Sequence, residues 1–229
     1  PRAATLVDQA VEVQTLFDSE HAAVLHVAAS FTVGEYLLPE LVAQWKRRHP
    51  ATRARMLIGN TSEVITAVAE FEVDVGFVEG AQTHPDLELR PWLTDELVVV
   101  AAPDHPLAGR RLGLRELREA GWVLREPGSG TREASDRWLL EGLGHINVEF
   151  ELGSTEAIKR FVAASGGVTC LSRHAVSQAL ELGWLVELQT RLPQTLRKLS
   201  VVTHRQKRLG AATAAFVRHC SQGCAAGAV

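Results

Sequence analysis

A β-turn-α pattern that occurs twice in each half of this 229-residue chain constrains its fold more than any other feature. The segment IGNTSEVITAV in the first half and LGSTEAIKRFV in the second share one order: an aliphatic residue, glycine, a small polar residue, threonine and an amphipathic run. Short apolar runs that alternate with helical patterns indicate an α/β fold. We therefore expect two α/β lobes of similar plan.

The order of the apolar runs sets the expected boundaries of the lobes. The strands expected in the first half are 24–29, 53–58, 73–78 and 97–102, and those in the second are 122–125, 148–152, 168–172 and 199–203. A last helix, 211–219, can pack back on the first lobe. We expect lobe I at 22–102 and 204–220, lobe II at 103–203, and two crossover strands, near 101–103 and 200–203, that form a hinge. Residues 221–229 are expected to be a disordered tail.

Residues 1–21 precede the first strand and carry an apolar stripe. Leu6, Ala10, Val13 and Phe17 recur at spacings of four and three residues, which is typical of a coiled coil. Two heptads are too few to stand alone, because isolated helices below about 12–15 residues are marginal in water. The stripe indicates either an amphipathic helix packed on this domain or the end of a longer dimerising linker helix.

The composition excludes several classes of protein. Hydrophobic residues make up 46% and charged residues 22%, which is close to the globular average, and no apolar run approaches the roughly 20 residues of a membrane helix. The net charge of -3 argues against nucleic-acid binding by bulk electrostatics. Three cysteines have no metal-ligand spacing; Cys170 is expected to be buried, and Cys220 and Cys224 to lie in a tail of small residues. With no signal-peptide pattern, a cytosolic location follows as the expectation.

Four polar loops lie where expected strands end and helices begin, which is where ligands bind in open parallel sheets. Backbone N–H groups at helix N-termini suit an anion, and glycines such as Gly130 allow close approach of the backbone. The loops supply the hydroxyls of Ser30, Thr32, Thr61, Ser129, Thr131 and Thr155. The alternative for each loop is simple N-capping, since Thr32 with Glu35 and Asn60 with Glu63 have capping-box spacing. Arg132 pairs either with the anion or with an acid such as Glu126.

Sequence signatures of enzymes are absent. The chain has no GxSxG elbow, no GxxxxGK[ST] phosphate loop, no GxGxxG fingerprint and no HExxH, and its nine histidines are scattered. We therefore expect neither catalysis, nor a cofactor, nor a metal site. An enzyme on the same scaffold would need a catalytic group in the cleft, and Lys159 is the only lysine close to a cleft loop.

The ordered runs resemble a known family. LHVAASFTVGEYLLPELVAQWKRRHP, GNTSEVITAVAEFEVDVGFVEG, DELVVVAAPDHPLA, WVLREPGSGTR and ELGSTEAIKRFVAASGGVTCLSR look like the effector domain of LysR-type transcriptional regulators over residues 22–219. The resemblance implies two Rossmann-like lobes of the type 2 periplasmic-binding-protein fold, joined by two crossover strands. It assigns effector binding in the cleft to Ser30, Thr32, Thr61, Ser129, Thr131 and Thr155. The EPGSGTR and GSTEAIK runs are most like the branch that includes regulators of sulfur and other inorganic-anion metabolism.

The resemblance also implies partners. Family members form homodimers and commonly tetramers, and they bind promoter DNA through an N-terminal winged helix-turn-helix, which is absent from this sequence. In their dimers the helix after the first loop packs against the partner's second lobe, so Leu38, Leu41 and Trp45 are candidates for either core or dimer interface.

We therefore expect the effector-binding domain of a LysR-type regulator that senses a small anionic metabolite or inorganic anion. The alternative is the solute-binding protein of an anion importer, which shares the fold and the anion-binding logic. Such a protein normally carries a signal peptide or a lipid-anchor cysteine. The heptad stripe before the first strand favours the regulator.

Overall fold

The computed structural model describes residues 24–80 and 82–223. The apolar stripe from Leu6 to Phe17 and residues 224–229 of the expected tail lie outside the described residues. The strands are β1 (Val24–Ser30), β2 (Arg53–Gly59), β3 (Val75–Glu79), β4 (Leu87–Ala101), β5 (Arg111–Leu112), β6 (Gly121–Arg125), β7 (Asn147–Leu152), β8 (Val168–Ser172), β9 (Val186–Glu187), β10 (Gln189–Thr190) and β11 (Thr195–His204). The helices are α2 (Phe31–Tyr36), α3 (Leu38–Arg48), α4 (Thr61–Ala69), α5 (Leu114–Glu119), α6 (Gly130–Leu143), α7 (Thr155–Ser165), α8 (Arg173–Glu181) and α9 (Ala211–Gly223).

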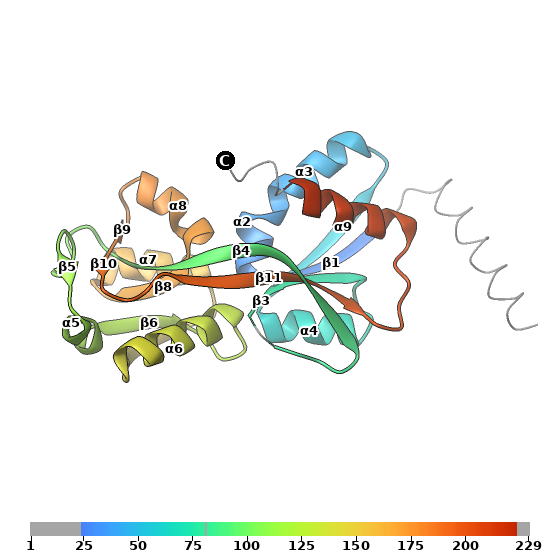
Figure 1. Cartoon of the computed structure of the whole chain (residues 1–229). Coiled ribbons are helices and arrows are strands. Elements are labelled where there is room, and N and C mark those ends of the chain that lie inside the picture. The colour runs from blue at the N-terminus through green and yellow to red at the C-terminus, as the bar shows by residue number, and fades with distance from the viewer. Residues whose placement is uncertain (1–23, 81, 224–229) are drawn as a thin grey trace, which may run out of the picture.

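One mixed sheet runs through the molecule in the order β2-β1-β3-β11-β4-β8-β6-β7, with β9 paired to β4. In lobe I, β1 pairs in parallel with β2 and β3; in lobe II, β6 pairs in parallel with β7 and β8. The long strands β4 and β11 are antiparallel and extend through both lobes (Figure 1). Helices cover each lobe, so the expected pair of α/β lobes with two connecting strands is present.

The chain crosses between the lobes inside these two strands, earlier than the positions expected at 102/103 and 203/204. Residues 97–101 of β4 already pair with β8, and Leu97 and Val99 pack in the core of lobe II. Leu199 and Val201 of β11 pair with β3 and pack in the core of lobe I. These pairings and cores favour boundaries at 93–97 and 195–199. An apolar strand has the same pattern in either lobe, so its sequence does not mark the crossing.

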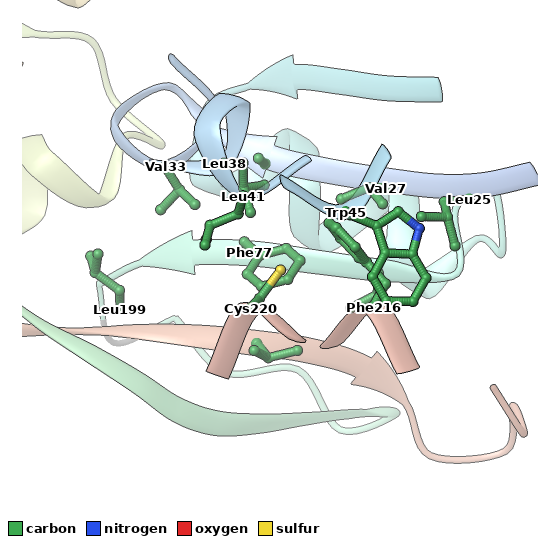
Figure 2. Packing of buried hydrophobic residues seen from close by; sticks show 13 residues of the cluster. Leu25, Val27, Val33, Leu38, Leu41, Trp45, Phe77, Leu199, Phe216 and Cys220 are labelled. Atoms are coloured by element: carbon green, nitrogen blue, oxygen red, sulfur yellow. The ribbon is translucent and has the colours of Figure 1, made fainter. Parts of the chain in front are cut away.

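The core of lobe I lies between the sheet and the helices α3 and α9 (Figure 2). Leu38, Leu41 and Trp45 of α3 are 0%, 6% and 6% exposed. The Trp45 ring meets the Phe216 ring edge-on, with centroids 5.7 Å apart. These three residues of α3 therefore pack in the core of this chain, which favours a core role over a place in a dimer interface. The break between α2 and α3 falls at Leu37, and Pro39 lies in the first turn of α3, where a proline is tolerated.

The last helix is longer than the sequence indicated. α9 continues to Gly223, and Cys220 is 0% exposed in the core of lobe I. The carbonyl of Cys220 accepts a hydrogen bond from the Trp92 indole over 3.1 Å. The expectations that Cys220 lies in a tail and that the tail begins at residue 221 are wrong. Small residues are poor markers of a tail, because alanine is the best helix former. Cys170 is 1% exposed, as expected.

Candidate functional site

The four polar loops meet where the two lobes face each other. In lobe I they connect β1 to α2 and β2 to α4, and in lobe II they connect β6 to α6 and β7 to α7. The hydroxyl residues expected at the site are each at most 1% exposed: Ser30, Thr32, Thr61, Ser129, Thr131 and Thr155. Buried hydroxyl groups need hydrogen-bond partners, so the partners of these six side chains define the chemistry of the site.

At the centre lies the carboxylate of Glu79, the last residue of β3, which is 1% exposed. Ser30 donates to one of its oxygens. Thr32 of lobe I and Thr131 of lobe II donate to the other, over 3.4 and 3.2 Å. The hydroxyl oxygens of these two threonines are 3.4 Å apart. Hydroxyls from both lobes thus converge on one anionic group.

Arg197 determines the direction in which the two threonines donate. Its Nη1 donates to Thr131 over 2.9 Å and its Nη2 to Thr32 over 3.3 Å. Its Nε donates over 2.7 Å to Asp95, which is 1% exposed. A guanidinium has only donors, so both hydroxyl oxygens act as acceptors toward it. Each threonine then has its single hydrogen left for an acidic acceptor, which here is Glu79.

Thr61 and Gly130 bring the backbones of the lobes together. Thr61 donates to the carbonyl of Glu79 over 3.0 Å and accepts from the N–H of Gly130 over 3.2 Å. A Cβ atom on Gly130 would lie 2.1 Å from that carbonyl oxygen. Glycine therefore allows the close backbone approach expected at this position, and the group approached is the end of β3 in lobe I.

Helix capping explains some of the expected site residues but not all. Asn60 and Glu63 form the expected capping box, and Ser129 caps α6 by accepting from the N–H of Arg132 over 3.3 Å. The expected box of Thr32 with Glu35 is absent, because α2 begins at Phe31 and Thr32 lies inside the helix. The Thr32 hydroxyl is therefore free of a capping role and faces Glu79.

A second buried guanidinium lies at the lobe II side of the site. Arg125 ends β6 and is 2% exposed. Its Nη1 donates to Thr155 over 3.0 Å, and its Nε and Nη2 donate to Glu126 over 2.7 and 2.8 Å. The group also lies 4.7 Å from the centre of the Phe31 ring in lobe I. Because Thr155 accepts from Arg125, its hydrogen is available for a ligand.

A cluster of titratable groups connects α2 to α7 beside the site. Tyr36 donates to Glu156, and Lys159 donates to the same carboxylate over 2.6 Å and lies 4.9 Å from the centre of the Tyr36 ring. Burial raises the pKa of the Tyr36 phenol, and the hydrogen bond to Glu156 raises it further. Burial and the neighbouring Glu156 also raise the pKa of Glu35. Lys159 therefore faces lobe I and stabilises the contact between the lobes.

Arg132 faces away from the converging hydroxyls. Its Nε donates to Asp136 over 2.8 Å, and its Nη1 donates to Glu151 over 2.7 Å and to the carbonyl of Arg125 over 2.6 Å. Glu126, the acid suggested by the sequence, pairs with Arg125 instead. This geometry favours a structural role for Arg132 within lobe II.

A family model described as the LysR substrate binding domain matches residues 18–225. The chain belongs to this family. It is 42% identical over 220 residues to the uncharacterized HTH-type transcriptional regulator YeiE of Escherichia coli K12. This match covers 96% of this chain and 75% of YeiE. It is also 38% identical over 157 residues to the HTH-type transcriptional regulator CysL of Bacillus subtilis, in a match that covers 68% of this chain and 52% of CysL.

Solved structures agree with this family. The CcmR regulatory domain of Synechocystis PCC6803 in complex with 2-PG superposes with a TM-score of 0.80 at 28% identity, covering 88% of this chain and 97% of that one. The effector binding domain of QuiR in complex with shikimate gives 0.80 at 19% identity, covering 91% and 100%, and shows the fold alone. The fold is thus the type 2 periplasmic-binding-protein fold of LysR effector-binding domains.

This LysR substrate-binding domain is therefore a regulatory domain of transcriptional regulators, and the importer alternative is not favoured. The family points to regulation rather than catalysis. Within residues 24–80 and 82–223, no helix has the length and apolarity needed to cross a membrane. The same residues contain no group of His, Cys, Asp and Glu side chains arranged to hold a metal ion.

Three charged residues of the site were missed by the sequence analysis. Glu79 and Arg125 each end a buried strand at the edge where the loops lie, and a charge directly after an apolar run was a usable signal. Arg197 gave no such signal, because it reaches the site only through the crossing of β11 between the lobes.

Proposed function

We propose that this LysR substrate-binding domain binds a small anion between its lobes, as the sensing part of a longer DNA-binding regulator. The observation that carries the proposal is the pair of Thr32 and Thr131, which come from different lobes and are oriented as donors by Arg197. Both already donate to a carboxylate, that of Glu79. Hydrogen bonds to an ionised acceptor are roughly twice as strong as neutral ones, so the same donors suit an acid ligand.

The other hydroxyls and the buried guanidinium of Arg125 extend this donor set. Thr155 and Ser129 each accept from a nitrogen and retain a hydrogen to donate. The CcmR domain is in complex with 2-PG and the QuiR domain is in complex with shikimate, which supports a small-molecule effector. A ligand held by both lobes shifts the equilibrium between open and closed forms by its differential affinity for the two.

The experiment is calorimetric titration and thermal unfolding of the purified chain with sulfate, phosphate, thiosulfate and small carboxylates. A ligand that binds only the native state stabilises it by about 2.7 kcal/mol at a hundred-fold excess over Kd. Thr131→Ala should weaken binding roughly 5- to 150-fold, which corresponds to about 1–3 kcal/mol for a lost hydrogen bond to a charged group. Thr66→Ala, at an exposed position of α4, is the matched control and should bind normally. Equal affinity in both variants would overturn the site assignment.

We also propose that the full-length protein acts in the cytoplasm as a homodimer and as a tetramer, and that it binds promoter DNA through an N-terminal winged helix-turn-helix. The two ends of the sheet support the dimer. β2 exposes Arg53, Arg55 and the 45% exposed Leu57, whereas β7 exposes Glu149 and the 47% exposed Phe150. The two edges carry opposite charges, and each also exposes a large apolar side chain. An antiparallel pair of chains would therefore place β2 of one copy against β7 of the other.

Sedimentation tests this interface. Leu57→Asp should shift the chain toward the monomer, and Leu182→Asp, which changes a 55% exposed leucine away from both edges, should not. A Leu57→Asp variant with the sedimentation coefficient of the wild type would exclude the proposed contact.

A further inference from the structure

Glu79 restricts the chemistry of any ligand that enters the site. The Thr61 hydroxyl donates to the carbonyl of Glu79, and the backbone of Glu79 pairs with Leu199 of β11, so two neighbouring elements hold the main chain of this residue. A Cβ atom on the following residue, Gly80, would lie 3.1 Å from the Cα of Gly130 in lobe II. The carboxylate therefore remains in the site while the lobes are in contact.

Within the part of the chain that the structure describes, no Lys, Arg or His side chain forms an ion pair with this carboxylate. Among the described residues, its hydrogen-bond partners are the hydroxyls of Ser30, Thr32 and Thr131. The neighbouring guanidinium of Arg197 is paired with Asp95, whose side chain is fully buried. An anion that approaches the two threonines thus comes close to the buried carboxylate of Glu79. Two like charges that are close together and away from water repel each other strongly.

An ionised carboxylate can only accept hydrogen bonds, and a fully deprotonated anion can also only accept them. Two such groups in contact would share no hydrogen. A ligand that carries an O–H next to its charged oxygen avoids this conflict. It donates to Glu79 in place of one threonine, and that threonine turns its hydrogen to the charged oxygen of the ligand.

We infer that the effector carries a proton donor that faces Glu79, so the site selects hydrogen oxyanions and hydroxy acids over fully deprotonated anions such as sulfate. This inference rests on the proposed binding of an anion between the lobes. Sites that hydrogen-bond a hydroxyl of the ligand reject analogues that lack it by large factors, and we expect a preference of about 100-fold or more.

The test is calorimetric titration of the full chain at neutral pH with two matched pairs: phosphate against sulfate, and glycolate against acetate. In each pair only the first member carries an O–H at this pH. The wild type should prefer the first member. Glu79→Gln, whose amide can donate, should admit sulfate and reduce the preference at least tenfold. Glu79→Asp keeps the acceptor and should retain the preference, while Glu181→Gln, at an exposed position of α8, is the matched control.

The possible outcomes separate the two proposals. Tight binding of sulfate or acetate to the wild type would overturn the inference and leave anion binding between the lobes intact. A preference that persists unchanged in Glu79→Gln would show that Glu79 is not its cause. Failure of all four ligands, and of the wider anion panel, to bind either the wild type or Glu79→Gln would overturn the proposed function and the inference together.

Discussion

Replacing Gly130 by alanine is expected to hold the two lobes apart without unfolding either of them. An added Cβ would lie 2.1 Å from the carbonyl oxygen of Glu79 and 2.7 Å from the Thr61 hydroxyl. An ordinary contact begins at 3.4 Å, so the start of α6 must move away from β3 by 1.3 Å. Gly130 is the first residue of α6, where alanine favours the helix by up to about 1 kcal/mol, and lobe II itself loses nothing.

The magnitude follows from the contacts that such a shift breaks. The bond from Gly130 to Thr61 is 3.2 Å long and that from Thr131 to Glu79 is also 3.2 Å, so neither survives a further 1.3 Å. A neutral hydrogen bond contributes about 0.5–1.5 kcal/mol and one to a charged group about 1.5–3 kcal/mol. The closed form should lose about 2–4.5 kcal/mol, and the affinity for an anion should fall roughly 30- to 2,000-fold.

Titration calorimetry and small-angle scattering measure the two consequences. Gly130→Ala should bind the anion weakly. At ligand concentrations that saturate the wild type, its radius of gyration should stay larger than that of the wild type. Gly113→Ala is the matched control, since its Cβ would meet only the Glu116 carboxylate at 3.6 Å, at the far end of lobe II (Figure 1). Wild-type affinity and radius in Gly130→Ala would refute the reasoning, because they would mean that the lobes do not need this contact.

Two further predictions concern the cores. Leu38→Ala should lower the free energy of unfolding by about 2–5 kcal/mol in urea titrations, because Leu38 is 0% exposed in lobe I, whereas Leu140→Ala at a 45% exposed position should change it little. Burial raises the pKa of the Cys170 thiol from its usual 9.0 to about 12. The native state then holds this proton more firmly than the unfolded state, so the stabilisation is complete below pH 9 and is lost as the pH rises toward 12, by up to about 1.4 kcal/mol per unit. Cys170→Ala should remove that part of the pH dependence, and an identical decline in both proteins above pH 9 would contradict it.

Local patterns predicted the elements whose ends carry a clear signal. The strand expected at 168–172 has these bounds in the structure, and the capping box of Asn60 and Glu63 marks the start of α4. β4 was predicted only at 97–102, although it begins at Leu87. Its first part contains Pro91, which argues against a regular strand, but Pro91 lies beside an irregularity in the pairing with β11. That irregularity depends on a partner strand far away in the sequence.

The hydroxyls of the site could be found from sequence because each lies in a loop with a local pattern. Their roles could not, because capping and ligand binding use the same residue types at the same spacing. The choice depends on where each hydrogen points, and for Thr32 this is set by Arg197, 165 residues away along the chain. Glu79 shows the same limit, since its partners come from both lobes.

The most direct test of binding between the lobes is a double-mutant cycle on Thr32 and Thr131, with the tightest-binding anion as the probe. The two hydroxyls are 3.4 Å apart, belong to different lobes and share the guanidinium of Arg197. If one anion contacts both, the losses of binding free energy in Thr32→Ala, Thr131→Ala and the double variant should be non-additive by about 0.5–3 kcal/mol. Losses that add to within about 0.3 kcal/mol, or a single variant with wild-type affinity, would contradict the account.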